Sequence, residues 1–461
     1  MLQQAIGKYR WTICALLFIA TTVNYLDRQV LSLLQPHLAE MFHWTNTDYA
    51  DITAVFQFVY AVALLFAGRI IDKLGTKKGY AWAIILWSAG AIVHALAIPI
   101  GEGITAVLGW TGIAAFSVSV LGFMFGRTVL AIGEAGNFPA AIKATAEYFP
   151  KKERSLATGI FNSGANVGAI LAPLTVPWIQ ANWGWGAAFV MIGAIGLLWL
   201  IFWFIYYEKP ERQKRLSASE LAYIQGGEEE APAVVAAGDI AEKKASWVKL
   251  LGYRQTWSFA FGKFMTDGVW WFFLFWLPAY LKAQYNMVGE VVAFPLAFLY
   301  TLSMVGSITG GWFPMYFIKK GHGVYDGRMK AMLVIALFPL IVLLAQPLGY
   351  ISYWVPVTLI GIGAAAHQAW SANIFTTVSD MFPKKAVGSV VGIGGMAGGI
   401  GGVVMSKLGG ALFDHYEQLG HIQTGYTIMF AICALAYLVA WIVMKALVPR
   451  YQPITAAEIE K

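Results

Sequence analysis

Twelve apolar stretches of roughly 20 residues or more follow one another along the 461-residue chain, and about 20 apolar residues suffice to cross a bilayer as a helix. Charged residues make up only 12% of the sequence, whereas soluble domains carry about 25%. We therefore predict an all-α integral membrane protein with twelve transmembrane helices. The stretches lie at 11–35, 51–71, 79–100, 108–136, 154–178, 185–207, 256–281, 290–318, 329–347, 352–376, 386–413 and 424–447.

Basic residues fall on alternate connections between these stretches. They crowd the connections after the second, fourth, sixth, eighth and tenth stretch, for example at Lys77 and Lys151, while the other connections carry almost none apart from Lys282. Because Lys and Arg mark cytoplasmic loops, both termini are predicted to be cytoplasmic. The net charge of +7 then follows from topology and attraction to anionic lipid. The expected partner is a lipid bilayer and no nucleic acid.

A short repeat divides the chain in two. The tetrapeptide FPKK occurs at 149–152 and again at 382–385, each time just before the fifth stretch of a set of six. Such a repeat indicates two pseudo-symmetric six-helix halves, although glycine-rich helices can also match by chance. The predicted parts are an N-terminal half at 1–207, a cytoplasmic linker at 208–254 and a C-terminal half at 255–461.

Two pairs of ionisable residues lie inside the apolar stretches, Asp27 with Arg28 and Arg127 with Glu134. A charge at mid-bilayer costs about 2.5–3.5 kcal/mol and therefore usually faces a cavity. Tyr25 and Arg28 share one helix face, whereas Asp27 points elsewhere. Arginine suits an organic anion, and a poorly hydrated carboxylate can exchange a proton near neutral pH. The alternative is that these residues form ion pairs that fix helix packing.

A polar cluster interrupts the tenth stretch at His367, Gln368, Trp370, Ser371 and Asn373. Amides pair with sugar hydroxyls, and aromatic rings pack on the C–H faces of sugars. Because the five residues span nearly two helical turns, they cannot all face one cavity. They predict either a binding site for a sugar-like solute or hydrogen bonds between helices, each worth about 0.6 kcal/mol.

Other polar and aromatic residues within the stretches admit simpler explanations. Lys263 and Asp267 are four residues apart and form either a local ion pair or a functional one. We expect His94 to be structural, and the sequence assigns no role to Lys407. The aromatic run at 270–276 forms either a cavity wall or part of the core.

Several motifs resemble one transporter family. The segment GRIIDKLGTKK at 68–78 resembles the conserved loop of the major facilitator superfamily, although Thr76 stands where a basic residue is usual. NYLDR, GEAGNFPA and FPKKERSLATG resemble the anion:cation symporter branch, and AHQAWSANIFTTVSDMF is similar to bacterial hexuronate transporters. The positions that match the loop motif, which controls gating in the family, are Gly68, Asp72, Lys73, Gly75, Lys77 and Lys78.

This resemblance implies proton-coupled import of glucuronate or galacturonate by alternating access, by a monomer in the bacterial inner membrane. Arg28 with Tyr25 would hold the substrate carboxylate. Asp27 and Glu134 would be the protonation sites, and Arg127 would pair with the carboxylates. The remaining residues expected at the sugar-acid site are Tyr80, Asn162, Asn166, His367, Gln368, Trp370 and Asn373.

Departures from the family pattern leave alternatives open. Galactonate carriers have a glutamine and an asparagine where this chain has Ala165 and Gly395, which argues against galactonate. Hexuronate carriers often lack the aspartate that stands here as Asp27, so the proton count stays open. Uptake of another aldonate or aldarate, or Na⁺ coupling, is the alternative. The sequence has no H-E-x-x-H, Cys/His cluster or G-x-S-x-G motif, so we expect no enzyme, cofactor or metal.

Overall fold

The computed structural model describes residues 7–109, 116–226 and 247–460, which fold into helices without any β-strand in these ranges. The long elements are α1 (Tyr9–Phe42), α2 (Asn46–Leu74), α3 (Thr76–Val93), α4 (Ala97–Gly109), α5 (Val118–Glu134), α6 (Asn137–Tyr148), α7 (Lys151–Trp183), α8 (Trp185–Tyr206), α11 (Arg254–Tyr285), α12 (Ala293–Thr309), α13 (Trp312–Lys319), α14 (Val324–Leu337), α15 (Trp354–Met381), α16 (Lys384–Gln418) and α17 (Ile422–Leu447). Short helices are α9 (Ala218–Gly226), α10 (Trp247–Leu250) and α18 (Ala456–Glu460).

These helices correspond to the twelve predicted stretches. Among the described residues, nine segments are long and apolar enough to cross a membrane. The other three stretches are α1, α11 and α15, which are 34, 32 and 28 residues long but more polar. All three contribute side chains to the cavity described below, which accounts for their polarity.

The start of the fourth stretch differs from the prediction. We expected a helix from residue 108, but α4 extends to Gly109 and α5 begins at Val118. Residues 108 and 109 belong to the preceding helix, and 110–115 lie outside the described residues. The error arose because apolar residues continue across the connection, so that periodicity alone does not mark its ends.

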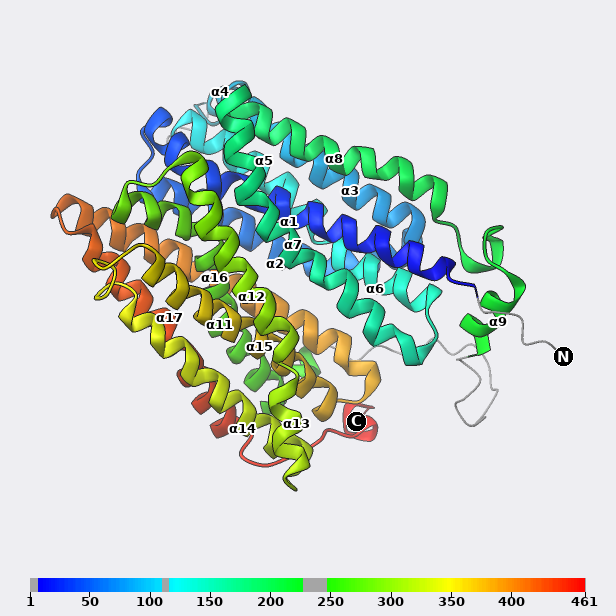
Figure 1. Cartoon of the computed structure of the whole chain (residues 1–461). Helices are drawn as coiled ribbons and strands as arrows, with labels where there is room; N and C mark the ends of the chain where they lie inside the picture. Colours follow the sequence, from blue (N-terminus) through cyan, green and yellow to red (C-terminus); the bar gives the residue numbers. More distant parts are fainter. Residues whose placement is uncertain (1–6, 110–115, 227–246, 461) are drawn as a thin grey trace.

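The long helices gather in two groups, α1–α8 and α11–α17, which lie side by side (Figure 1). Across the boundary, α2 packs along α16, α7 along α12, and α1 against α11. Glycines allow the closest of these approaches. A methyl group on Gly399 of α16 would lie 2.5 Å from Cβ of Ala61 on α2, so the two helices could not meet as closely with a larger residue there.

Polar contacts join the two groups at the side of the bundle where α1 ends and α2 begins, which we call the distal side. The Asp414 carboxylate of α16 accepts hydrogen bonds from the backbone N–H groups of Asn46 (2.7 Å) and Thr47 (2.8 Å). It therefore caps the N-terminus of α2, where N–H groups have no partner within the helix. Nearby, Lys407 pairs with Asp51. Lys407, to which the sequence assigned no role, therefore forms an ion pair between α16 and α2 on the distal side. It does not line the cavity described below.

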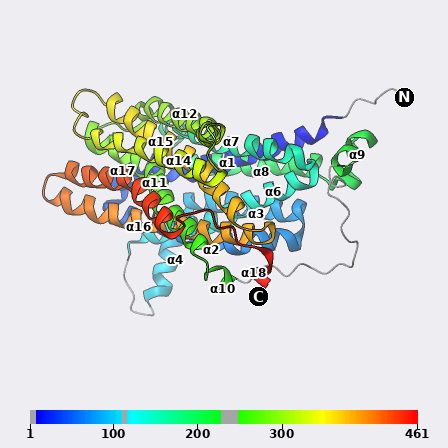
Figure 2. The same ribbon diagram turned by 90° about the horizontal axis from the view of Figure 1, so that it is seen from below.

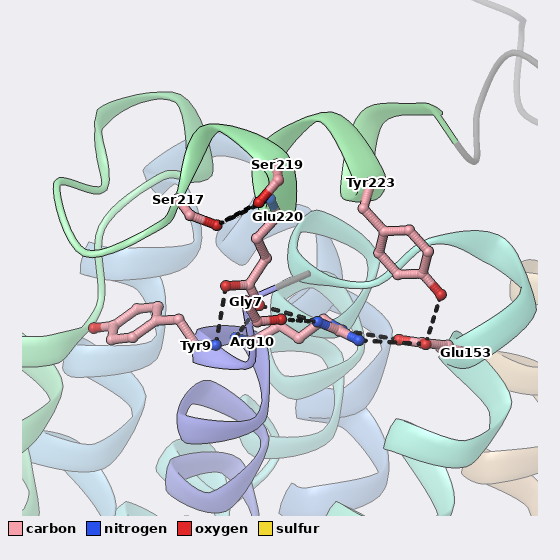
Figure 3. Close-up of polar contacts among 8 residues, drawn as sticks. All are labelled: Gly7, Tyr9, Arg10, Glu153, Ser217, Ser219, Glu220 and Tyr223. Carbon is pink, nitrogen blue, oxygen red and sulfur yellow. Dashed lines mark hydrogen bonds and ion pairs between the residues drawn. The ribbon is translucent and has the colours of Figure 1, made fainter. Parts of the chain in front are cut away.

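The two short helices between the groups, α9 and α10, contact different groups. Glu220 of α9 accepts hydrogen bonds from the backbone N–H groups of Tyr9 and Arg10, both at 3.0 Å, and from the Arg10 side chain (Figure 3). Arg10 also bonds Glu153 of α7 at 2.9 Å. By contrast, α10 packs against α16, and α9 and α10 lie well apart in Figure 2. The hydrogen bonds described for residues 208–226 thus fasten this segment to the first group.

Candidate functional site

A cavity of about 1220 Å³ lies between the two groups of helices. Its walls come from α1, α2, α6 and α7 on one side and from α11, α12, α15 and α16 on the other. The lining extends to Asp72, Trp247 and Gly388, which lie at the helix ends nearest the chain termini. Because the distal contacts seal the other end, the cavity opens toward the side of the termini.

Arg28 projects into this cavity within a box of aromatic rings. The centre of its guanidinium lies 4.6 Å from the Tyr25 ring, 4.9 Å from Tyr60 and 5.2 Å from Trp271. Its Nε and Nη2 atoms donate to Oε2 of Glu134 at 2.8 and 2.7 Å. Cation–π contacts and one carboxylate thus hold a buried cation in place. The prediction that Tyr25 and Arg28 share the cavity-facing side of α1 is confirmed.

Asp27 points away from the cavity, and only 2% of the residue is exposed. Neither of its carboxylate oxygens has a hydrogen-bond partner among the described residues. The charged groups that act on it are Glu134 and Arg127. A buried carboxyl group without any hydrogen bond is unusual, because buried polar groups normally find partners.

Arg127 does not make the expected hydrogen bonds to carboxylates. Its Nη1 and Nη2 atoms donate to the backbone carbonyl of Arg28 at 3.2 and 3.3 Å. The Glu134 oxygen that makes hydrogen bonds is already engaged by Arg28. Arg127 therefore acts on Asp27 and Glu134 through its charge, while its hydrogen bonds fasten α5 to α1.

The predicted polar residues of α7 line the cavity. Asn162 and Asn166 both contribute to its wall, as does Ala165 between them. Neither amide hydrogen-bonds to another side chain or backbone group in the described part of the chain, so both can bind a solute. Gly395 lines the opposite wall. Ala165 and Gly395, the two positions at which this chain differs from galactonate carriers, therefore both line the cavity.

The polar cluster of α15 splits between two faces of the helix. His367, Gln368 and Ser371 line the cavity. The His367 ring stacks on Trp270, with centroids 5.1 Å apart, and its Nδ1 lies 2.9 Å from the Tyr437 hydroxyl. Gln368 and Ser371 make no side-chain hydrogen bond to the described residues, which leaves their polar groups available to a ligand.

Trp370 and Asn373 lie outside the cavity, contrary to the prediction. Trp370 is fully buried and meets the Tyr437 ring edge-on at 5.6 Å. The Asn373 amide donates to the carbonyls of Gly310 and Ala369, both at 2.8 Å. The two residues are one helical turn apart and so share the face that packs on neighbouring helices. Here the alternative of interhelical hydrogen bonds is correct for Asn373.

Tyr80 is also placed elsewhere than expected. It is fully buried between α3 and α8, with its ring 5.1 Å from that of Trp203. Its hydroxyl donates to Oδ1 of Asn137 at 2.6 Å. Because α3 packs against α5 and α8 and contributes nothing to the cavity wall, Tyr80 does not reach a solute there, and its hydroxyl instead ties α3 to α6.

Several cavity residues were missed or left ambiguous by sequence reasoning. The sequence did not mark Tyr60 as a cavity residue, because it is a single aromatic residue in an apolar helix. Trp271 belongs to the aromatic run at 270–276, for which the sequence allows either a cavity wall or the core. In the structure, Trp271 lines the cavity. Lys263 and Asp267 form an ion pair at 2.6 Å and both line the cavity. His94 is structural as expected, with its ring stacked 4.8 Å from Phe189.

The loop motif between α2 and α3 lies at the open end. Gly75 has φ +77°, a conformation that favours glycine. Asp72 pairs with Lys143 at 3.0 Å, and Thr76, the departure from the motif, donates to Glu147 at 2.6 Å. Lys77 pairs with Glu208 at 2.8 Å, and this hydrogen bond lowers the pKa of the Glu208 carboxyl. Of the other motif positions, Gly68 lines the cavity, whereas Lys73 and Lys78 are exposed.

A cavity that is sealed at one end of a membrane-helix bundle and open at the other is the geometry of a solute transporter. The model of the Major Facilitator Superfamily matches residues 17–406. The chain belongs to this superfamily, whose members are transporters and not enzymes.

Named relatives agree with this assignment. The chain is 31% identical over 446 residues to the "Hexuronate transporter" of Escherichia coli (strain K12), covering 95% of this chain and 94% of the relative. It is 34% identical over 314 residues to the "Galacturonate transporter" of Dickeya chrysanthemi, covering 67% and 83%. Among solved structures, a D-xylose-proton symporter has a similar fold, with a TM-score of 0.71, 15% identity and coverage of 97% and 100%.

Proposed function

We propose that this chain is a proton-coupled symporter that imports a sugar acid, namely a hexuronate such as glucuronate or galacturonate, by alternating access. The observation that carries the proposal is the arrangement around Arg28. A cavity-facing guanidinium is balanced by Glu134 and lies beside Asp27, a buried carboxyl group without a hydrogen-bond partner. Anion binding and proton binding can therefore act on one another over a short distance.

Arg28 provides the anion site. A guanidinium fork binds a carboxylate through two parallel hydrogen bonds. In this structure Glu134 occupies that fork, at 2.7 Å from Nη2. A substrate carboxylate would compete with Glu134 for the same donors. Protonation of Glu134 would weaken its hold on Arg28, so that a proton and a substrate anion bind together.

Asp27 provides a second proton site. An ionised carboxylate that is buried without a partner costs several kcal/mol, whereas the neutral acid costs far less. Arg127 offsets part of that cost through its charge, without a hydrogen bond. Asp27 can thus exist in either protonation state as its surroundings change, which is what a coupling residue requires. Protons serve as the coupling ion, and the mechanism uses no other cofactor.

The rest of the cavity suits a polyhydroxylated anion. Asn162, Asn166, Gln368 and Ser371 offer amide and hydroxyl groups without partners among the described residues, and Trp271 and Tyr60 offer flat faces for sugar C–H bonds. Ala165 and Gly395 give no amide at the two positions where galactonate carriers have one. The names of the hexuronate and galacturonate transporters similar to this chain support the same substrate class.

The proposal places the protein in the bacterial inner membrane as a monomer, with both termini in the cytoplasm. The cavity then opens to the cytoplasm, and the contacts of Asp414 with α2 close the periplasmic side. Import requires that these distal contacts break while the cytoplasmic ends of the helices come together.

The test is uptake of labelled glucuronate and galacturonate into proteoliposomes, with and without an inward proton gradient. The wild type should accumulate a hexuronate only with the gradient. Asp27→Asn should lose accumulation but keep gradient-free exchange. Asp326→Asn removes a carboxylate paired with Lys445 outside the cavity and should behave as wild type.

Other outcomes would change the proposal. If an aldonate or aldarate accumulates and neither hexuronate does, the substrate assignment is wrong. If accumulation follows a sodium gradient instead of a proton gradient, the coupling ion is wrong. If Asp27→Asn accumulates substrate as the wild type does, Asp27 is not the coupling site.

A further inference from the structure

The cavity contains a second charged pair, on the wall opposite Arg28. Lys263 and Asp267 lie one turn apart on α11, and Lys263 Nζ is 2.6 Å from Asp267 Oδ2. Both side chains line the cavity. Lys263 is 5% exposed, and its ammonium lies 4.4 Å from the centre of the Phe375 ring. The pair is thus held in a fixed, largely desolvated position that faces the solute space.

Asp267 keeps one oxygen available. Its Oδ2 atom pairs with Lys263, while Oδ1 makes no hydrogen bond with any group in the described part of the chain. The carboxylate is pressed against Gly398 of α16, where a methyl group would lie 2.3 Å from Oδ2. A carboxylate that is buttressed in this way presents a fixed acceptor to the cavity, and it loses little entropy when it binds a ligand.

The charge balance decides what such a pair can bind. Asp267 neutralises Lys263, so the pair has no net charge with which to attract a second anionic group. A carboxylate oxygen and an ammonium side by side can accept from one hydroxyl and donate to its neighbour. Charge-assisted hydrogen bonds of this kind are stronger than those of neutral amides. Adjacent hydroxyl groups of a sugar are the matching ligand.

We propose that Lys263 and Asp267 form the subsite that recognises the hydroxyl groups of the substrate, at the end of the sugar remote from the carboxylate that Arg28 holds. The pair is then a specificity determinant that distinguishes sugar acids from simple carboxylates of similar size. This inference rests on the proposed function, because it assumes that a sugar acid occupies the cavity.

The experiment is equilibrium binding of labelled hexuronate to the purified protein, with displacement by analogues that each lack one hydroxyl. In the wild type, at least one deoxy analogue should bind about 10- to 100-fold more weakly than the parent, as expected for loss of a hydrogen bond to a charged group. Asp267→Asn should bring the affinities for the parent and that analogue close to one another, because the freed charge of Lys263 acts on both anions alike while the acceptor for the hydroxyl is lost. Asp326→Asn should preserve the wild-type ratio.

A second variant separates recognition from folding. The double variant Lys263→Gln/Asp267→Asn retains two hydrogen-bonding groups without charge, and its melting temperature and elution profile report whether it is folded. If the folded variants bind parent and analogues with the wild-type ratio, or weaken all of them equally, the subsite is refuted. If the wild type binds no sugar acid at all, the proposed function fails instead, so the two failures are distinguishable.

Discussion

At the scale of single residues, the proposed anion site should depend on the shape of Arg28 as much as on its charge. Arg28→Lys should raise the dissociation constant for glucuronate at least about tenfold, because an ammonium cannot present two parallel donors to a carboxylate. Arg328→Lys is the matched control, since Arg328 pairs with Asp380 at 2.8 Å outside the cavity. Binding of labelled glucuronate to purified protein measures both. Equal affinity of Arg28→Lys and wild type would contradict the assignment.

Glu134 should act as a competitor of the substrate. Glu134→Gln leaves the Arg28 guanidinium without its counter-charge, and loss of one partner from a buried ion pair costs about 3–5 kcal/mol. The melting temperature without substrate should therefore fall. Glucuronate should then raise it by more than it does in the wild type, because its carboxylate replaces the missing charge. A rise equal to that of the wild type would show that the two carboxylates do not share one site.

Residue-level prediction from the sequence succeeded where helix geometry alone decides. The spacing of three between Tyr25 and Arg28 places both on one face, and both line the cavity. For α15, the helical period shows that five residues cannot share a face, but it does not show which of them turn away. Only the packing of neighbouring helices shows that Trp370 and Asn373 turn away from the cavity. Tyr80 was assigned by resemblance alone, and its burial beside Trp203 has no signal in the sequence.

At the scale of whole helices, one carboxylate links the two groups at their closed end. Asp414→Asn should shift the conformational equilibrium toward an outward-open state, because a charged cap at the N-terminus of α2 is lost and such caps contribute about 0.5–2 kcal/mol. That range corresponds to a population change of roughly 2- to 30-fold. The change should appear as a longer distance between spin labels at His43 and Leu419, both exposed at distal helix ends.

A control on the same helix end separates this contact from simple capping. Asp48→Asn disturbs the capping box that Thr45 and Asp48 form within the first turn of α2, and the hydrogen bonds described for Asp48 are all to Thr45 and not to α16. Its label distances should match those of the wild type. If both variants shift equally, the cross-group contact of Asp414 does not hold the distal side closed.

Element boundaries were predictable where charge or proline interrupts the apolar pattern. A long helix begins directly after the proline of each FPKK segment, α7 at Lys151 and α16 at Lys384. The connection between α4 and α5 carries no such interruption, and its position was wrong. The attachment of α9 to α1 could not be foreseen, because the Glu220–Arg10 pair joins residues 210 positions apart.

At the scale of the whole molecule, the contacts of α9 with α1 and of α10 with α16 predict that the two groups of helices, α1–α8 and α11–α17, are separable. Fragments 1–236 and 237–461, when co-expressed, should assemble and transport, because α9 stays with α1 and α10 stays with α16. A cut between Arg215 and Leu216 instead leaves α9 on the second fragment and should lower the yield of the complex. Affinity co-purification with uptake assays measures both. Failure of the 236/237 pair alone to assemble would refute the division.

The partnership of Arg28 and Glu134 also constrains how the protein is made. The two residues are 106 positions apart, so α1 leaves the ribosome long before its counter-charge in α5 has been synthesised. A helix that holds an unpaired arginine enters lipid at a cost of about 2.5–3.5 kcal/mol. We therefore expect insertion of the nascent α1 to become more favourable once α5 arrives, so that the early helices of the chain help one another into the bilayer.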